Sequence, residues 1–195
     1  MARPRSFDYD VALKAIADAF RFEGYAATSL DDLMTATGLK KGSLYKAFGD
    51  KREMFVKALD RELETARSQR EEAFQNAESP KGAVRTWLYG EVDRIFGDDD
   101  RDVAGCLIVN AVVDPAPADP EIGEKLRAAQ ADLQQAVEAQ ISLGQRYGEF
   151  RMDIEVPKLA AGLISGASGV ALGLRLGWSR DRAQEESDIL VRLLG

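Results

Sequence analysis

Apolar residues recur along most of the chain at intervals of three and four, which is the period of an amphipathic helix. The first such stripe consists of Tyr9, Leu13, Ile16 and Phe20, and it predicts a helix over about 8–23. No run alternates apolar and polar residues in the way that a half-buried strand requires. The pattern therefore favours an all-α fold.

Two short helices are expected next, separated by a glycine turn. The stretch "TSLDDLMTATG" begins with Thr28 as the expected N-cap, places Asp31 as the acid of a capping box, and ends at Gly38. Gly38 can adopt the left-handed conformation that a tight turn needs, at no steric cost. A third helix is predicted over about 40–47, with Gly49 after it.

Asp50 and Glu53 have the spacing of a second capping box, which predicts the start of a fourth helix. Its apolar stripe extends the expected helix to about residue 76. Five further helices follow from the same reasoning, and they include the apolar run "CLIVNAVV", interpreted as a buried helix, and two helices begun by Pro157 and Ser179.

The predicted architecture is all-α with about nine helices. Three N-terminal helices form a helix-turn-helix domain over 1–50, and a larger helical ligand-binding and dimerisation domain covers 51–195. The fourth helix, about 50–76, links the two.

Composition excludes several classes of site. Cys106 is the only cysteine and the chain has no histidine. This rules out an intrachain disulfide and a zinc site built from paired cysteines, and it removes histidine-based catalytic triads. We therefore expect no enzyme, no cofactor and no metal.

The chain shows no feature of a membrane or secreted protein. The longest uncharged apolar run, 159–174, is shorter than the roughly 20 residues that a bilayer-spanning helix needs. No apolar stretch follows the basic N-terminus, as a secretory signal would require. A soluble cytoplasmic protein is expected.

Charge is unevenly distributed. The net charge is -7, yet residues 1–55 hold nine Lys/Arg against eight Asp/Glu, whereas the remainder holds 17 against 25. The stretch "TGLKKGSLYKAFGDK", 37–51, carries four lysines and one acid. An acidic body would repel nucleic acid everywhere except at such a patch.

The basic stretch fits the second helix of a helix-turn-helix, which enters the major groove of DNA. Four lysines are expected to neutralise phosphates, two hydroxyls to donate to phosphates, and a glycine to leave room for the sugar-phosphate backbone. In that order these residues are Lys40, Lys41, Lys46 and Lys51; Ser43 and Tyr45; and Gly42. Lys41, Ser43 and Lys46 are the candidates to reach base edges. Leu44 and Phe48 would hold this helix on the first, and Arg3 and Arg5 could form a minor-groove arm.

The segment "YAATSLDDLMTATGLKKGSLYKAFGDKREMF", Tyr25 to Phe55, closely resembles the signature of TetR-type transcriptional regulators, of the form GxxKGxLYxxFxxKxxLF. The resemblance covers about thirty residues, and the rest of the chain agrees in length and helix order. Two positions depart from the usual pattern: Lys46 stands where many relatives carry histidine, and Met54 where leucine is usual.

The resemblance implies a DNA-binding regulator, most commonly a repressor, that a small-molecule inducer releases from its operator. Carried over by position, the family's DNA contacts fall on Thr28, Lys41, Gly42, Ser43, Tyr45, Lys46 and Lys51. It also implies a homodimer whose last two helices, about 156–194, pair with those of a second subunit. The recurring glycines of this region, which would allow close helix approach, are Gly162, Gly166, Gly169, Gly173 and Gly177; packing within one subunit is the alternative.

Candidates to line an inducer pocket are Trp87, Glu91, Cys106 and Asn110, for each of which an ordinary core or surface position is the alternative. Cys106 could also sense oxidants or electrophiles, although most buried cysteines act as small hydrophobes.

Two other functions stay open as alternatives. Asp98, Asp99 and Asp102 have the DDxxD spacing with which all-helical prenyl-diphosphate synthases hold Mg²⁺. A helical adaptor or membrane-peripheral protein could use the basic segment against an anionic surface, but that segment lacks the wide apolar face this requires.

Overall fold

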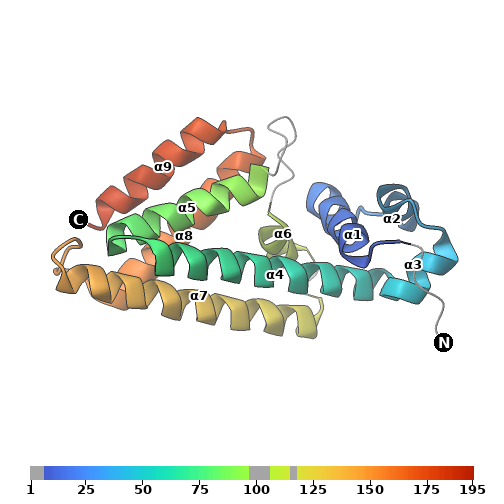
Figure 1. The fold of residues 1–195 in the computed structure, drawn as a ribbon, viewed down its shortest axis with the longest axis horizontal. Helices are drawn as coiled ribbons and strands as arrows, with labels where there is room; N and C mark the ends of the chain where they lie inside the picture. The colour runs from blue at the N-terminus through green and yellow to red at the C-terminus, as the bar shows by residue number, and fades with distance from the viewer. Residues whose placement is uncertain (1–6, 97–105, 115–117) are drawn as a thin grey trace. The chain divides into compact units, whose positions relative to one another are not determined.

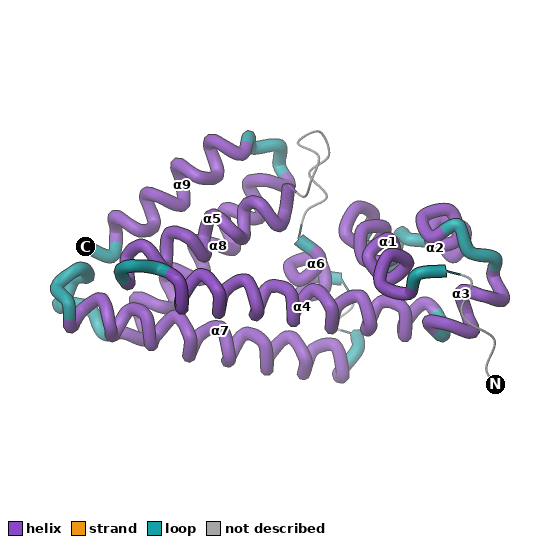
Figure 2. The backbone as a smooth tube through the Cα atoms, viewed as in Figure 1, coloured by secondary structure: helices purple, strands orange, loops and turns teal. Residues whose placement is uncertain are grey.

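The computed structural model describes residues 7–96, 106–114 and 118–195, and throughout these ranges the chain forms helices joined by short loops (Figures 1 and 2). The described part contains nine helices and no strand, which confirms the all-α prediction. They are α1 (Tyr9–Glu23), α2 (Leu30–Thr37), α3 (Lys41–Phe48), α4 (Lys51–Asn76), α5 (Pro80–Phe96), α6 (Leu107–Val113), α7 (Pro120–Arg146), α8 (Val156–Arg175) and α9 (Arg180–Leu193).

The chain divides into two compact units. Unit 1 comprises Met1–Leu63 and Leu107–Gly123, and unit 2 comprises Glu64–Cys106 and Glu124–Gly195. The first unit therefore extends beyond residue 50 and includes α6, which lies far from it in sequence. A functional division at residue 50 stays a prediction.

Aromatic packing holds unit 1 together. Phe48 of α3 is fully buried and stacks on Tyr9 of α1, with 4.6 Å between the ring centroids. Phe20 of α1 meets Phe55 of α4 edge-on at 5.1 Å. Such pairs add about 0.5–1.5 kcal/mol beyond their buried area. Leu44 is also fully buried, so α3 is fixed by the two residues that the sequence predicted.

The N-cap of α2 differs from the prediction. Ser29, not Thr28, has the extended backbone of an N-cap, and its hydroxyl accepts from the backbone N–H of Asp32 at 3.2 Å. Asp32 in turn accepts from the backbone N–H of Ser29 at 2.7 Å, which completes the capping box and lowers the pKa of Asp32. Thr28 is buried, and its hydroxyl donates to the Gly24 carbonyl at 2.6 Å.

The turns on either side of α3 follow the prediction. Gly38 adopts the left-handed conformation, with φ 66° and ψ 10°. The backbone N–H of Glu53 donates to Asp50, and the Glu53 carboxylate accepts from the backbone N–H of Asp50, both at 2.8 Å. Gly49 has φ 84°, and a Cβ there would overlap the side chain of Glu53.

The run "CLIVNAVV" is a helix, as expected, but it is not buried all round. Of the seven residues of α6, only Leu107 and Ala111 are buried, four positions apart on one face. Val112 and Val113 are 52% and 72% exposed. The expectation of a buried helix was therefore right for one face and wrong for the other.

Unit 2 has its own apolar core. It draws on α4, α5, α7, α8 and α9, and its largest aromatic side chain is Trp87, which is 4% exposed and meets Phe74 edge-on. Pro157 lies in the first turn of α8 and the Ser179 hydroxyl caps α9, both as predicted.

Charged side chains join α4 to α7 within unit 1. The Arg52 guanidinium donates to both carboxylate oxygens of Asp119, at 2.5 and 3.0 Å, and to Glu121 at 2.6 Å. Asp119 also accepts from the backbone N–H groups of Glu121 and Ile122, and so caps α7. The bond to Arg52 is the main cause of the lowered pKa of Asp119.

This lowered pKa predicts how acid acts on unit 1. Because the folded-state pKa of Asp119 lies below the unfolded value of about 3.9, the carboxylate stabilises the fold above that value and stops doing so as pH falls through its folded pKa. We expect Asp119→Asn to be less stable than wild type at pH 7 and the two unfolding midpoints to converge toward pH 2. Urea unfolding followed by circular dichroism tests this, with Glu185→Gln, an exposed acid of α9, as the control. A midpoint difference that did not change with pH would contradict it.

Candidate nucleic-acid interface

Helix α3 has one buried and one exposed face. Leu44 and Phe48, one turn apart, are fully buried. Six of the predicted DNA-contacting residues are exposed, and they are Lys40, Lys41, Gly42, Ser43, Tyr45 and Lys46. The structure thus brings these six together on a surface that we call the α3 face.

The α3 face has the charge and hydrogen-bonding groups that a phosphate backbone needs. α3 itself contains no acid, and Lys40, at its N-cap, makes no side-chain capping bond. A helix N-terminus of this kind favours anions, because its first N–H groups point outward and the helix dipole is positive there. Lys41 lies one turn from Tyr45, with its ammonium 6.0 Å from the ring centroid.

Gly42 has no structural reason within the chain to be glycine. A Cβ at this position would have no atom within 4 Å. Glycine in a helix interior costs about 1 kcal/mol relative to alanine, and nothing in unit 1 compensates for that cost. The small residue therefore leaves space on the outside of α3.

The C-terminus of α3 is held by a residue that sequence reasoning missed. The Lys57 ammonium, on α4, donates to the carbonyl of Phe48 at 2.7 Å. This satisfies one of the carbonyls that a helix leaves open at its end. Lys57 belongs to no motif in the sequence, so only the packing of α4 beside α3 reveals it.

Two of the predicted contacts are engaged within unit 1. Thr28 is 1% exposed and bonded to Gly24, so its hydroxyl is not offered to DNA, and we remove it from the proposed contacts. The Lys51 ammonium donates to the carbonyl of Ala26 at 3.3 Å and lies 4.8 Å from the centroid of Tyr25. Lys51 is half-buried, so its structural role accompanies any contact with phosphate. Arg3 and Arg5 lie outside the described residues.

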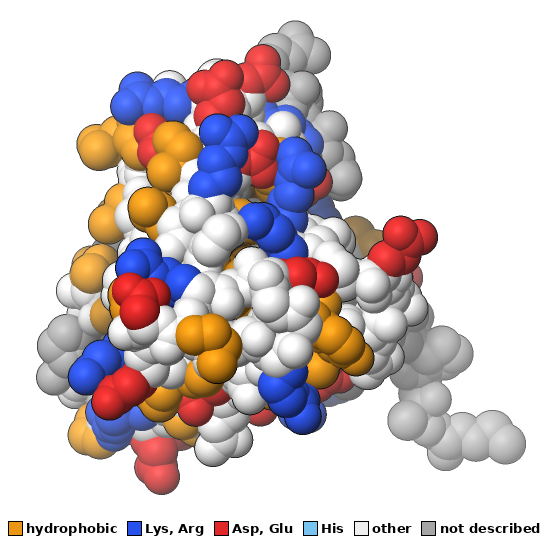
Figure 3. Space-filling model, turned by 90° about the vertical axis from the view of Figure 1, so that its left-hand side faces the viewer, with side chains coloured by type: hydrophobic (Ala, Val, Ile, Leu, Met, Phe, Trp, Pro, Cys, Tyr) orange, Lys and Arg blue, Asp and Glu red, His pale blue; other side chains and the backbone are white. Residues whose placement is uncertain are grey.

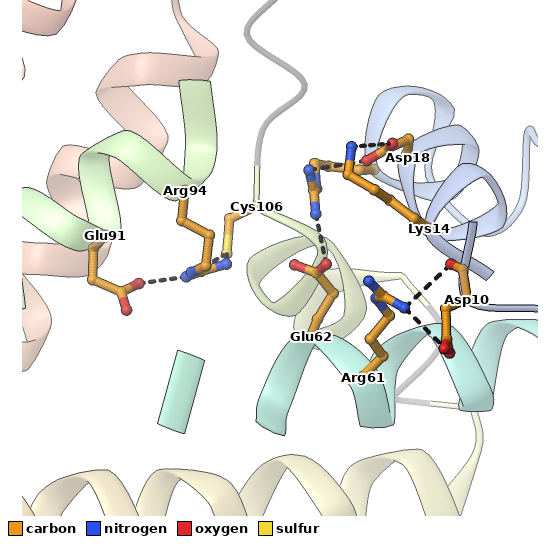
Figure 4. A network of polar contacts seen from close by, with 9 residues as sticks. Asp10, Lys14, Asp18, Arg61, Glu62, Glu91, Arg94 and Cys106 are labelled. Carbon is orange, nitrogen blue, oxygen red and sulfur yellow. Dashed lines mark hydrogen bonds and ion pairs between the residues drawn. The ribbon is translucent and has the colours of Figure 1, made fainter. Parts of the chain in front are cut away.

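The four candidates for an inducer pocket do not gather at one place. Trp87 belongs to the core of unit 2. Glu91 pairs with Arg94, whose two terminal nitrogens lie 3.9 Å from the sulfur of buried Cys106 (Figure 4). Asn110 belongs to unit 1, where its amide donates to the carbonyl of Arg21 at 3.0 Å. Arg94 was not anticipated from the sequence.

The alternative functions gain no support from the described residues. Asp98, Asp99 and Asp102 lie outside them, and within them no group of three His, Cys, Asp or Glu could hold a metal ion. α8 is long and apolar enough to span a bilayer, with a mean hydropathy of 1.3, although core helices of soluble proteins meet the same criterion.

Family models match both parts of the chain. Residues 12–58 match the model for bacterial regulatory proteins of the TetR family, and residues 97–187 match the model for the tetracyclin repressor-like C-terminal domain. Together they cover more than half of the sequence. The chain belongs to the TetR family. It is a DNA-binding transcriptional regulator, as the resemblance of Tyr25 to Phe55 predicted.

Relatives and solved structures agree with this assignment. The chain is 29% identical over 192 residues to the transcriptional repressor ComR of Escherichia coli, covering 98% of this chain and 90% of ComR. It is 27% identical over 195 residues to the regulator YezE of Bacillus subtilis, with full coverage of both. Its fold matches the TetR family regulator CifR, solved with 26-base-pair operator DNA, with a TM-score of 0.84, 26% identity and full coverage of both chains.

Gly42 gives a prediction that separates stability from DNA binding. Gly42→Ala should raise the free energy of unfolding by up to about 1 kcal/mol, because it removes a helix-interior glycine, and should weaken DNA binding, because a methyl group then stands on the α3 face. Thermal unfolding and fluorescence anisotropy measure the two effects.

Gly90→Ala is the matched control. Gly90 lies inside α5, and a Cβ there would also meet open space. This substitution should stabilise the protein and leave DNA affinity unchanged. Unchanged DNA affinity in Gly42→Ala as well would show that Gly42 does not face the DNA backbone.

Proposed function

We propose that this regulator is a cytoplasmic repressor that binds a palindromic operator as a homodimer and is released by a small-molecule inducer. The observation that carries this proposal is the α3 face, on which three lysines, two hydroxyls and one glycine are exposed while Leu44 and Phe48 fix the helix from behind. The repressor ComR and the operator complex of CifR support the proposal.

The residues of the α3 face have distinct proposed roles. Lys40, Ser43 and Tyr45 bind phosphates and set the register on the duplex, and such contacts carry no sequence information. Lys41 and Lys46 neutralise phosphates and, with Ser43, reach base edges in the major groove. Lys51 adds a phosphate contact at the edge of the face.

Selection of bound fragments from random duplex DNA tests the function. We expect a palindrome with half-sites about 10 base pairs apart centre to centre, or a multiple of that spacing, because each half-site is read by one recognition helix of a dimer. The recovered fragment should lose affinity steeply with salt. Recovery of no common sequence, or of one unrepeated half-site, would contradict the proposal.

The proposed dimer surface lies on α8 and α9. The structure divides the glycines of α8 into two groups. A Cβ on Gly166 would overlap Leu190, and one on Gly173 would overlap Trp178, so these two pack within the subunit. Gly162 and Gly169 face open space, which leaves them free to approach a second subunit.

Apolar side chains of the same two helices are exposed. Leu172 and Leu176 of the α8 end are 51% and 84% exposed, and Ile189 and Leu193, one turn apart on α9, are 46% and 61% exposed. On the face drawn in Figure 3, apolar side chains are likewise open to solvent among basic and acidic ones. Leucines and small residues on adjacent helices suit a four-helix interface between two subunits.

Charge at this surface should break the dimer. The double substitution Ile189→Arg and Leu193→Arg should raise the dimer dissociation constant at least about tenfold, since burying two unpaired charges costs well over 1.4 kcal/mol. Sedimentation velocity at micromolar concentration measures it. Met152→Arg, at a residue 73% exposed between α7 and α8, is the control and should stay dimeric. A wild-type monomer would overturn the proposed dimer.

The inducer is proposed to act on unit 2. Trp87, Glu91 and Cys106 belong to that unit and stay as candidates to line its site. An inducer releases DNA only if it prefers one arrangement of the two recognition helices over the other. Helix α4 is suited to transmit that preference, because it runs unbroken from unit 1 into unit 2.

A further inference from the structure

The turn between α1 and α2, residues 24–28, carries backbone groups that its own helices cannot satisfy. Distant side chains satisfy three such groups in and beside the turn. The amide of Asn110 donates to the carbonyl of Arg21 at 3.0 Å, and the carboxylate of Asp114 accepts from the N–H of Ala26 at 2.8 Å. The third contact, from Lys51 to the carbonyl of Ala26, comes from α4.

Asn110 and Asp114 act from one side of α6. They are four residues apart, so they project from the same side of the helix, and the backbone N–H of Asp114 donates to the carbonyl of Asn110 at 3.0 Å. α6 packs on α1, with its buried residues Leu107 and Ala111 on the apolar face. The two polar side chains therefore reach the end of α1 and the turn after it.

The segment that carries them is fixed at its other end as well. Asp119 and Glu121 bind Arg52 in the first turn of α4, directly after Lys51. Residues 107–123 thus hold two places that flank the recognition helix in the sequence: the turn before α2 and the start of α4. None of their contacts involves the α3 face.

We propose that Asn110 and Asp114 are positioning residues for DNA binding. They hold the α1–α2 turn in the arrangement that places α2 and α3 correctly on DNA, and they do so without contacting DNA. The inference rests on the proposed function of the α3 face. When the acceptor at Asp114 is lost, the turn samples further conformations, and binding must then restrict them at a cost in affinity.

The test compares two substitutions at one position. Asp114→Ala removes the acceptor for Ala26 and the charge, whereas Asp114→Asn removes the charge and keeps an acceptor. We expect Asp114→Ala to bind the selected operator about three- to tenfold more weakly than Asp114→Asn, the range that one hydrogen bond supplies. The slope of log affinity against log salt should be equal in the two variants, because neither changes the number of phosphate contacts.

Two further measurements separate positioning from general stability. Stoichiometric titration with operator gives the fraction of active protein, which should be the same in both variants. Hydrogen exchange of the Ala26 amide should be faster in Asp114→Ala than in Asp114→Asn. Asn110→Ala should also weaken binding, and its effect should be less than additive with that of Asp114→Ala, because both residues hold one turn.

Lys41→Ala is the reference for the α3 face, since it should weaken binding and reduce the salt slope by about one. If Lys41→Ala leaves operator affinity unchanged, the proposed role of the α3 face is wrong. If Lys41→Ala weakens binding while Asp114→Ala binds like Asp114→Asn, the positioning role is wrong. A fall in active fraction with an unchanged dissociation constant would also overturn it, because Asp114 would then serve folding alone.

Discussion

The burial of Leu44 and Phe48 is the interaction on which the proposed function depends. α3 has only eight residues, and an isolated helix of that length is marginal in water. Its orientation therefore comes from what it packs against, chiefly the stack of Phe48 on Tyr9 and the contacts of fully buried Leu44. Because these two residues face inward, Lys41, Ser43 and Tyr45 must face outward. Hydrophobic packing thus determines which side of the helix can meet phosphate.

The sequence predicted the position of each helix well and its local contacts less well. Caps were accurate where one residue could serve, as at Asp50, and failed at "TSLDD", where Thr28 with Asp31 and Ser29 with Asp32 have the same spacing. Both pairs satisfy the rule for a capping box. Only the burial of Thr28 distinguishes them, and burial depends on how α1 and α2 pack together.

Long-range placement explains the other differences. Asn110 was expected beside Trp87 because both lie in the larger domain by sequence, but α6 packs on α1, and its amide bonds to Arg21. In α8 the glycine spacing predicted close helix approach correctly but not between which helices: Gly166 and Gly173 face Leu190 and Trp178 of the same chain. A period of three or four marks a helix face and does not say whether that face is internal or external.

The division of the chain also bears on how a signal from the proposed inducer could reach DNA. The chain passes between the two units three times: within α4 after Leu63, between Cys106 and Leu107, and within α7 after Gly123. The second and third crossings bound the segment that carries Asn110 and Asp114. A rearrangement of unit 2 can therefore act on the α1–α2 turn without passing along α4. Since the first turn of α4 also holds that turn through Lys51, both routes end at the same few backbone groups, next to the helix that precedes α3.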